Sequence, residues 1–129
     1  MAVYTRPSLT MLSTTTVTTV TSVSINENHS TGSFAGDNDS YAMGWAGAGT
    51  VNASIQMADI NQAKSLVDTE YSYLAVTHAA AGGGTDEITT LSDVKVVSIG
   101  LTNPFDANSG CTVGIAYVGA GGTTSPIVG

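Results

Sequence analysis

Few side chains in this sequence have the type and spacing that binding or catalytic chemistry requires. Asp37 and Asp39 stand two residues apart in the segment GDNDS, as in the first half of a calcium loop. The pattern then fails, because Tyr41 takes the fifth position, no glycine follows it and no glutamate closes the loop. We therefore predict no metal site here. A turn is the main interpretation, and a weak cation site is the alternative.

No nucleophile or base is tied to a partner by its spacing. Cys111 is the only cysteine, which excludes an internal disulfide, and its place in a predicted strand suits a small buried side chain. His29 and His78 are far from it in sequence, and no motif joins them. The chain also lacks a GxSxG elbow and a GxGxxG nucleotide loop. The sequence thus predicts no catalytic residue, no cofactor and no enzyme.

Charge in this chain is scarce and mostly acidic. Only 10% of its 129 residues are charged, and the formal net charge is −7. The three cations, Arg6, Lys64 and Lys95, are scattered, so we expect neither a nucleic-acid partner nor an anionic membrane partner. Thr, Ser, Gly and Ala replace the missing charge, and such a neutral surface packs readily on a neighbour. This composition favours a subunit of an assembly, with an extracellular or halotolerant monomer as the alternative.

Strand signals recur along the middle of the chain, separated by turn signals. The strongest is residues 13–25, where β-branched side chains suit a pleated strand better than a helix. Asp59 followed by Gln62 has the spacing of a helix N-cap with its reciprocal partner, and predicts a short helix that ends near Leu66. The predicted fold is all-β, a sandwich or small barrel of about six to eight strands with one short helix and extended terminal arms.

Residues 26–49 differ in composition from the predicted strands. They are rich in Asn, Asp, Ser and Gly, so we expect a long loop with at most one short strand near residues 41–45. Trp45 is expected to anchor this loop on the core, and an exposed binding tryptophan is the alternative. Tyr41 and Trp45 are the candidate binding residues of the loop, because long ordered loops tend to be functional.

The two chain ends are expected to be extended segments outside a single β domain of residues 13–118. Residues 1–12 show no sustained period and would form an arm that docks on the body or on a neighbouring subunit. Its candidate contact residues are Val3, Tyr4, Leu9, Met11 and Leu12. Residues 119–129 form a small-residue C-terminal extension. We expect no signal peptide and no membrane span, because no basic segment precedes an apolar run and no run approaches about 18 residues.

In general character the chain resembles small tailed-bacteriophage virion proteins, particularly head decoration or cement proteins. The resemblance is carried by the apolar N-terminal arm, the Thr/Ser/Gly/Ala-rich body, the few charges, the lone cysteine and the lack of a signal. It implies a non-enzymatic structural protein of the virion, assembled in the host cytoplasm, that decorates or cements a capsid or tail lattice. Its partners would be copies of itself, with a trimer as one form, and a major capsid or tail protein. The alternative function is a receptor- or carbohydrate-binding module that uses the loop 26–49.

Overall fold

The structure is a computed structural model that describes residues 4–38, 40–103 and 108–129, without the side chains of residues 5–7 and 83. Its β-strands are β1 (Tyr4–Leu12), β2 (Thr15–Thr16), β3 (Val20–Phe34), β4 (Met43–Met57), β5 (Glu70–Ala80), β6 (Glu87–Thr102), β7 (Gly110–Tyr117) and β8 (Ile127–Val128). One short helix, α1 (Ile60–Leu66), and one 3-10 turn, η1 (Ala81–Gly83), join them. The prediction of an all-β fold with one short helix is confirmed.

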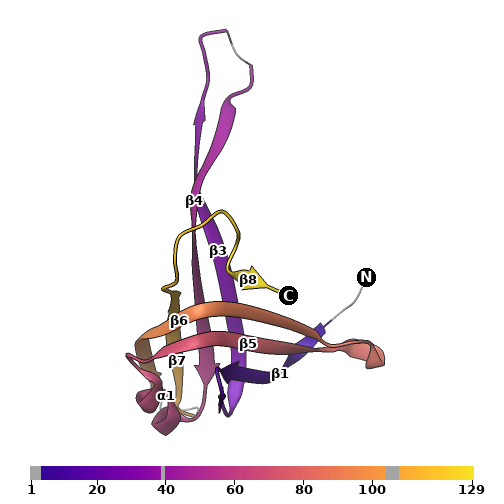
Figure 1. Cartoon of the computed structure of the whole chain (residues 1–129), viewed down its shortest axis with the longest axis vertical. Coiled ribbons are helices and arrows are strands. Elements are labelled where there is room, and N and C mark those ends of the chain that lie inside the picture. The colour runs from indigo at the N-terminus through magenta and orange to yellow at the C-terminus, as the bar shows by residue number, and fades with distance from the viewer. Residues whose placement is uncertain (1–3, 39, 104–107) are drawn as a thin grey trace.

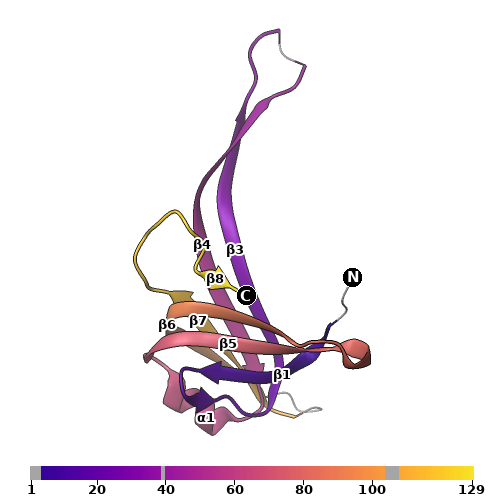
Figure 2. The ribbon, with the colours of Figure 1, turned by 45° about the vertical axis from the view of Figure 1, so that its right-hand side comes forward.

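The strands form one antiparallel sheet that folds over on itself. Their order is β2-β1-β5-β6-β7-β4-β3, and β8 pairs with β6 outside this path. Figures 1 and 2 show β5 and β6 crossing the lower half of β3 and β4, so the two parts of the sheet face each other. This arrangement is sandwich-like, and the core lies between the two layers.

The core is made of aliphatic side chains that alternate along the strands with exposed residues. Its fully buried large members are Leu12, Ile55, Met57, Leu74, Leu91, Ile115, Val76, Val94, Val96 and Val113. On β7 this alternation is regular, because Val113 and Ile115 are both buried and Cys111 lies on the same face. The helix adds Ala63 and Leu66. These contacts concentrate the packed part of the protein in the lower body seen in Figure 1.

The helix begins as predicted, but its cap is only half of the expected pair. The Asp59 carboxylate accepts a hydrogen bond from the backbone amide of Gln62 at 3.1 Å, and the helix ends at Leu66. The Gln62 side chain does not reach back to the cap. Its amide donates to the Thr16 carbonyl at 2.8 Å, and its oxygen accepts from the Thr18 amide at 2.9 Å. Gln62 therefore holds the connection between β2 and β3 against the helix.

Residues 13–25 do not form the single strand predicted from their β-branched side chains. The chain turns back after β1, pairs briefly as β2 and breaks again before β3. Ser13 and Thr19 have φ values of 53° and 51°, and Val17 between them is buried in the core. Packing of Val17 together with hydrogen bonds to Gln62 outweighs local strand propensity in this segment.

The prediction that residues 26–49 form a loop is also wrong. They continue β3 to Phe34 and begin β4 at Met43, so only residues 35–42 connect the strands. Cross-strand pairing extends from Val20 opposite Met57 to Phe34 opposite Met43. The small polar composition was misleading because this part of the hairpin buries neither face, so no apolar alternation is required.

Both chain ends dock on the body of the same molecule. β1 pairs antiparallel with β5, and β8 pairs with β6. Leu12, predicted as a contact residue of a docking arm, has no exposed surface and belongs to the core. For Leu12 the structure shows docking on the body, one of the two placements expected for this segment, because β1 places Leu12 opposite the buried Leu74 of β5. Val3 lies outside the described residues.

Candidate functional site

The distal half of the β3–β4 hairpin stands clear of the body. We call residues 27–51 the arm; Figures 1 and 2 both show it projecting beyond the other strands. Pairing of β4 with β7 ends at Asn52 opposite Ala116, and above that point β3 and β4 pair only with each other in the described chain. None of the described arm residues is buried. Above its base, the arm is therefore a two-stranded ribbon without a second layer.

Glycines in the arm make room for larger side chains on the opposite strand. The Trp45 ring lies over Gly32, its register partner, and a Cβ at Gly32 would overlap the ring. Gly49 likewise faces the imidazole of His29, and a Cβ there would lie 2.6 Å from the ring atom Cε1. The two glycines thus leave room for the rings of Trp45 and His29 to lie against the ribbon.

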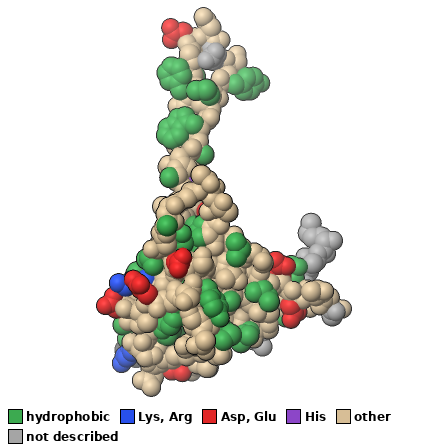
Figure 3. Space-filling model, viewed as in Figure 1, with side chains coloured by type: hydrophobic (Ala, Val, Ile, Leu, Met, Phe, Trp, Pro, Cys, Tyr) green, Lys and Arg blue, Asp and Glu red, His purple; other side chains and the backbone are tan. Residues whose placement is uncertain are grey.

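The end of the arm carries large apolar side chains that no other described residue covers. Phe34 is 68% exposed, Tyr41 91%, Met43 66% and Trp45 56%. Figure 3 shows hydrophobic side chains gathered near the end of the projection. We call these four residues the tip. Between residues 30 and 58 the sequence holds only two charged residues, Asp37 and Asp39, so the tip is apolar and nearly uncharged.

The tip corrects the interpretation of Trp45 and extends the predicted site. Trp45 does not anchor a loop on the core, since it lies on the exposed ribbon. Tyr41 also lies at the tip, so the two residues singled out from the sequence share one region. Phe34 and Met43 were missed, although they lie opposite each other in the hairpin. Their symmetrical placement around the Asn/Asp turn is the signal that could have found them.

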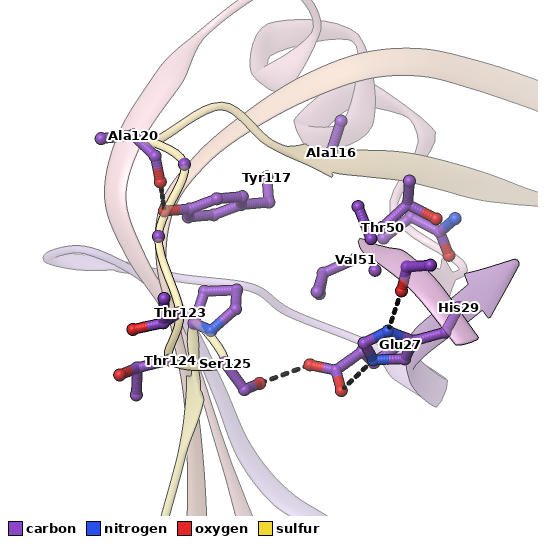
Figure 4. A pocket seen from close by; sticks show the side chains of 17 residues that line it. Glu27, His29, Thr50, Val51, Ala116, Tyr117, Ala120, Thr123, Thr124 and Ser125 are labelled. Atoms are coloured by element: carbon purple, nitrogen blue, oxygen red, sulfur yellow. Dashed lines mark hydrogen bonds and ion pairs between the residues drawn. The ribbon is translucent and has the colours of Figure 1, made fainter. Parts of the chain in front are cut away.

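A slot lies at the base of the arm. Its volume is about 800 Å³, and one wall is the base of the arm, with β4 from Gly47 to Asn52 and Glu27 and His29 of β3. The other wall is the segment 119–126, which we call the strap, because it leaves β7 and returns to β8. Figure 4 shows Ala120, Thr123 and Ser125 of the strap on one side of the slot and Val51 on the other. The slot therefore lies between the strap and the base of the arm.

Side-chain hydrogen bonds fix the strap on both sides of the slot. Tyr117 Oη donates to the Ala120 carbonyl at 2.7 Å, where the strap begins. Ser125 Oγ donates to Glu27 Oε1 of β3 and accepts from the Ile127 amide, where the strap ends. These bonds tie the strap to the arm base and to β8.

His29 joins this network through both ring nitrogens. Nδ1 lies 3.0 Å from the Gly47 carbonyl oxygen, and Nε2 lies 3.2 Å from Glu27 Oε2 (Figure 4). Between His29 and Thr31 the register shifts, with β4 gaining one residue there. Such a bulge disturbs the ladder, and the imidazole supplies a donor to the Gly47 carbonyl at that place. Two oxygen acceptors favour the doubly protonated ring.

The same contacts shift two pKa values in opposite directions. The pKa of His29 is raised by its bond to the Gly47 carbonyl and then by Glu27. The pKa of Glu27 is lowered by the hydrogen bond from Ser125 and then by His29. The two side chains are 47% and 31% exposed, so solvent screens their attraction. The pair acts as a positioning contact for the strap and the arm base.

The order of these groups differs from that of a hydrolytic triad. In a triad the imidazole lies between the hydroxyl and the carboxylate and takes the hydroxyl proton. Here Glu27 lies between Ser125 and His29, and both His29 nitrogens face other acceptors. Sequence reasoning missed Glu27, although the spacing Glu-x-His on a strand places both side chains on one face.

The remaining candidates from the N-terminal segment lie on the outer face of the body. Leu9 is opposite Thr77, which is opposite Ile88, so these three share one face. Val128 is opposite Thr90, two residues beyond Ile88 on the same face. Leu9, Ile88 and Val128 are all exposed, and we call them the outer patch. Met11 lies half-buried beside it, and Tyr4 contacts His78 edge to face.

The other chemistry-bearing residues found in the sequence are not brought together. Cys111 is buried, and desolvation raises the pKa of its thiol. Asp86 accepts from the Ala80 amide at 3.2 Å and closes the turn after β5. In the described part of the chain no three His, Cys, Asp or Glu side chains cluster as metal ligands would. Asp39, half of the candidate cation pair, is outside that part.

Among the described residues, no helix has the length and apolar character needed to cross a membrane. Neither the models of known protein families nor the curated proteins with which the chain was compared give a match. The arm, the tip, the slot and the outer patch are therefore the features on which a function can be argued.

Proposed function

We propose that the chain is a non-enzymatic structural protein of a virus particle, which decorates or cements a capsid or tail lattice through subunit contacts. The observation that carries this proposal is the arm, a bare two-stranded ribbon that ends in the apolar tip. A ribbon of two strands is marginally stable alone in water. A partner surface that covers the ribbon supplies the missing second layer.

The tip has the chemistry of a contact centre. Burial of one large apolar side chain contributes about 1.5–3 kcal/mol before the costs of ordering are subtracted. The tip presents four such side chains close to the hairpin turn: Phe34, Tyr41, Met43 and Trp45. Aromatic residues also dominate the centres of protein interfaces, where exclusion of water makes each contact stronger.

The outer patch supports contacts on a second side of the subunit. Leu9, Ile88 and Val128 lie on the outer layer of the body, away from the tip. Figure 3 shows hydrophobic side chains also on the body face that β5 and β6 cross in Figure 1. A lattice subunit touches neighbours on more than one side, and two separate apolar surfaces fit that need.

The proposed partners are further copies of this chain and a major capsid or tail protein. With 10% charged residues and a net charge of −7, the chain offers little that would bind nucleic acid. Its neutral surface of small residues suits close packing between protein subunits. The proposed location is accordingly the virion.

Mass spectrometry of density-gradient-purified virus particles from the source culture tests the location. We expect peptides of this chain in a fixed ratio to the major capsid or tail protein through successive gradients. Loss of the chain from particles that keep their other proteins contradicts the proposal.

Sedimentation velocity of the purified chain at several concentrations tests the contact residues. We expect concentration-dependent association that the double variant Phe34→Ser/Trp45→Ala weakens by about tenfold or more. The matched control is Val97→Ala, because Val97 of β6 is 54% exposed but lies in neither the tip nor the outer patch. A wild-type chain that neither associates nor binds its particles rejects the proposed assembly.

A receptor- or carbohydrate-binding module is the second candidate function. The exposure of Tyr41 and Trp45 favours it, because flat aromatic faces held clear of a body can stack on sugar rings. Glycan-array binding separates the two functions. Loss of glycan binding in Tyr41→Ala and Trp45→Ala, with association unchanged, supports the module; absence of glycan binding in the wild type supports the structural protein.

A further inference from the structure

The strap is attached at its two ends and unsupported between them. At its start, Tyr117 Oη donates to the Ala120 carbonyl, and at its end Ser125 Oγ donates to Glu27 of β3. Residues 121–124 make no hydrogen bond with any other described residue, and all four are exposed. The strap therefore depends on side-chain contacts at its ends to keep its place over the slot.

β8 adds only a short attachment beyond the strap. It pairs with β6 through Val128 opposite Thr90 and Ile127 opposite Leu91. Ile127 packs half-buried against the core, whereas Val128 is exposed. β7, by contrast, pairs with β6 from Val94 to Thr102. Segments with few buried contacts open at a lower free energy than the rest of a native structure, so β8 should separate from β6 more readily than β7 does.

The strap lies where the core reaches the base of the arm. Ile25 and Ala53 are opposite each other, and both belong to the core or pack against it. Glu27 and Val51 are the next opposed pair on the same face, and both line the slot. The core-facing side of the hairpin thus continues into the slot beneath the strap.

We propose that the strap and β8, residues 119–128, form a latch that opens as one piece while the rest of the sheet stays folded. Its fastening is the hydrogen bond from Ser125 to Glu27, which joins residues 98 positions apart in the sequence. Ser125 Oγ also accepts from the Ile127 amide, so one hydroxyl connects the fastening with β8. Loss of the Ser125–Glu27 bond therefore loosens the strap and β8 together. This inference does not rest on the proposed function.

An open latch changes two surfaces of the protein. It removes Val128 from the outer patch and leaves only Leu9 and Ile88 there. It also uncovers Val51 and Tyr117 in the lining of the slot. A partner that binds the complete outer patch favours the closed latch, because a ligand shifts the equilibrium toward the state that it binds better.

Hydrogen exchange of the isolated chain, followed by NMR, tests the latch. In wild type we expect the Ile127 amide to exchange much faster than the amides of Val113 and Ile115 in β7. Glu27→Ala should speed exchange at Ile127 several-fold and leave the β7 amides unchanged. Because this variant keeps Ser125 Oγ, the direct acceptor of the Ile127 amide, the faster exchange reports opening of the latch.

The matched control is Glu70→Ala, because Glu70 of β5 is an exposed strand carboxylate whose side chain forms no hydrogen bond or ion pair with a described residue. Exchange at Ile127 that is the same in wild type, Glu27→Ala and Glu70→Ala overturns Glu27 as the fastening. Exchange at Ile127 that is as slow as at Val113 overturns the separate opening of the latch.

Limited proteolysis gives a second measurement. Ser125→Ala removes the fastening, and Thr124→Ala removes the neighbouring hydroxyl, which makes no hydrogen bond with a described residue. We expect cleavage within residues 119–126, located by intact mass, to be several-fold faster in Ser125→Ala than in wild type or Thr124→Ala. Equal rates in all three proteins contradict the fastening, and cleavage that begins only when the β spectrum is lost contradicts the latch.

Discussion

The imidazole of His29 donates from Nδ1 to the carbonyl oxygen of Gly47, 3.0 Å away, where the hairpin leaves the body. The bond crosses the bulge in β4, and Glu27 holds the other side of the same ring. One side chain thereby links the irregular point of the arm to the strap, since Glu27 also accepts from Ser125.

The His29–Glu27 contact predicts a pH window for the arm base. The pKa of Glu27 is lowered, so its contribution is present above the ordinary Glu pKa of about 4.3 and is lost as pH falls through the lowered value. The pKa of His29 is raised, so its contribution is present below the ordinary His pKa of about 6.5 and is lost as pH rises through the raised value. Both contribute fully between those two ordinary values.

NMR titration of the His29 ring checks this window. Glu27→Gln removes the carboxylate, so the His29 pKa should fall. The His78→Gln variant assigns the signal, because the chain has only two histidines. A His29 pKa that is the same in wild type and Glu27→Gln contradicts the contact.

The Trp45–Gly32 packing predicts a local effect of substitution. Gly32→Val places side-chain atoms where the Trp45 ring lies, so the ring must move. We expect a changed indole N–H chemical shift and a melting temperature close to that of wild type, because neither Gly32 nor Trp45 belongs to the core or packs against it. Gly44→Ala is the control, since its nearest neighbouring atom would be 3.9 Å from the new Cβ. An unchanged indole signal in Gly32→Val shows the ring to be elsewhere.

Two leucines of β1 should differ sharply in their effect on folding. Leu12→Ala leaves a cavity in the core and should lower the free energy of unfolding by about 2–5 kcal/mol. Leu9→Ala, on the exposed outer patch, should stay within about 0.5 kcal/mol of wild type. Urea denaturation followed by far-UV circular dichroism measures both. Equal losses in the two variants contradict the placement of β1.

The helix cap predicts a stability change near α1. Asp59→Ala removes the acceptor for the Gln62 amide and should cost about 0.5–2 kcal/mol. Asp59→Asn keeps a capping oxygen and should recover most of that loss. The same denaturation measurement applies, and a loss in Asp59→Asn as large as in Asp59→Ala shows that another role of the residue dominates.

The sequence patterns that carried information were those of buried elements. Alternation at Val113 and Ile115 reports a strand with one face in the core, and Asp59 marks a helix start by local hydrogen-bonding chemistry. Both kinds of signal act within a few residues, so they are visible without the fold. The reciprocal bond predicted for the Gln62 side chain was wrong. That side chain bonds instead to Thr16 and Thr18, which come from a distant segment of the sequence.

The arm was missed for a related physical reason. Periodicity records which face is buried, and a ribbon exposed on both faces leaves no such record in its Gly, Ala, Ser and Thr residues. Tyr41 and Trp45 were still recognised, because large aromatic side chains in a polar stretch are unusual whatever the backbone does. The slot depends on Glu27 and Ser125, which lie far apart in sequence and meet only through the strap.

The position of Trp45 determines what optical measurements on this protein report. It is the only tryptophan, and it lies on the arm rather than in the core. Its emission therefore follows whatever touches the ribbon and responds weakly when the body melts. Thermal unfolding followed by intrinsic fluorescence and by circular dichroism should give different transitions. That difference would arise because the only tryptophan lies outside the cooperatively unfolding body, and it would not indicate a folding intermediate. The Trp45 emission can then be used to monitor subunit contact without an attached label.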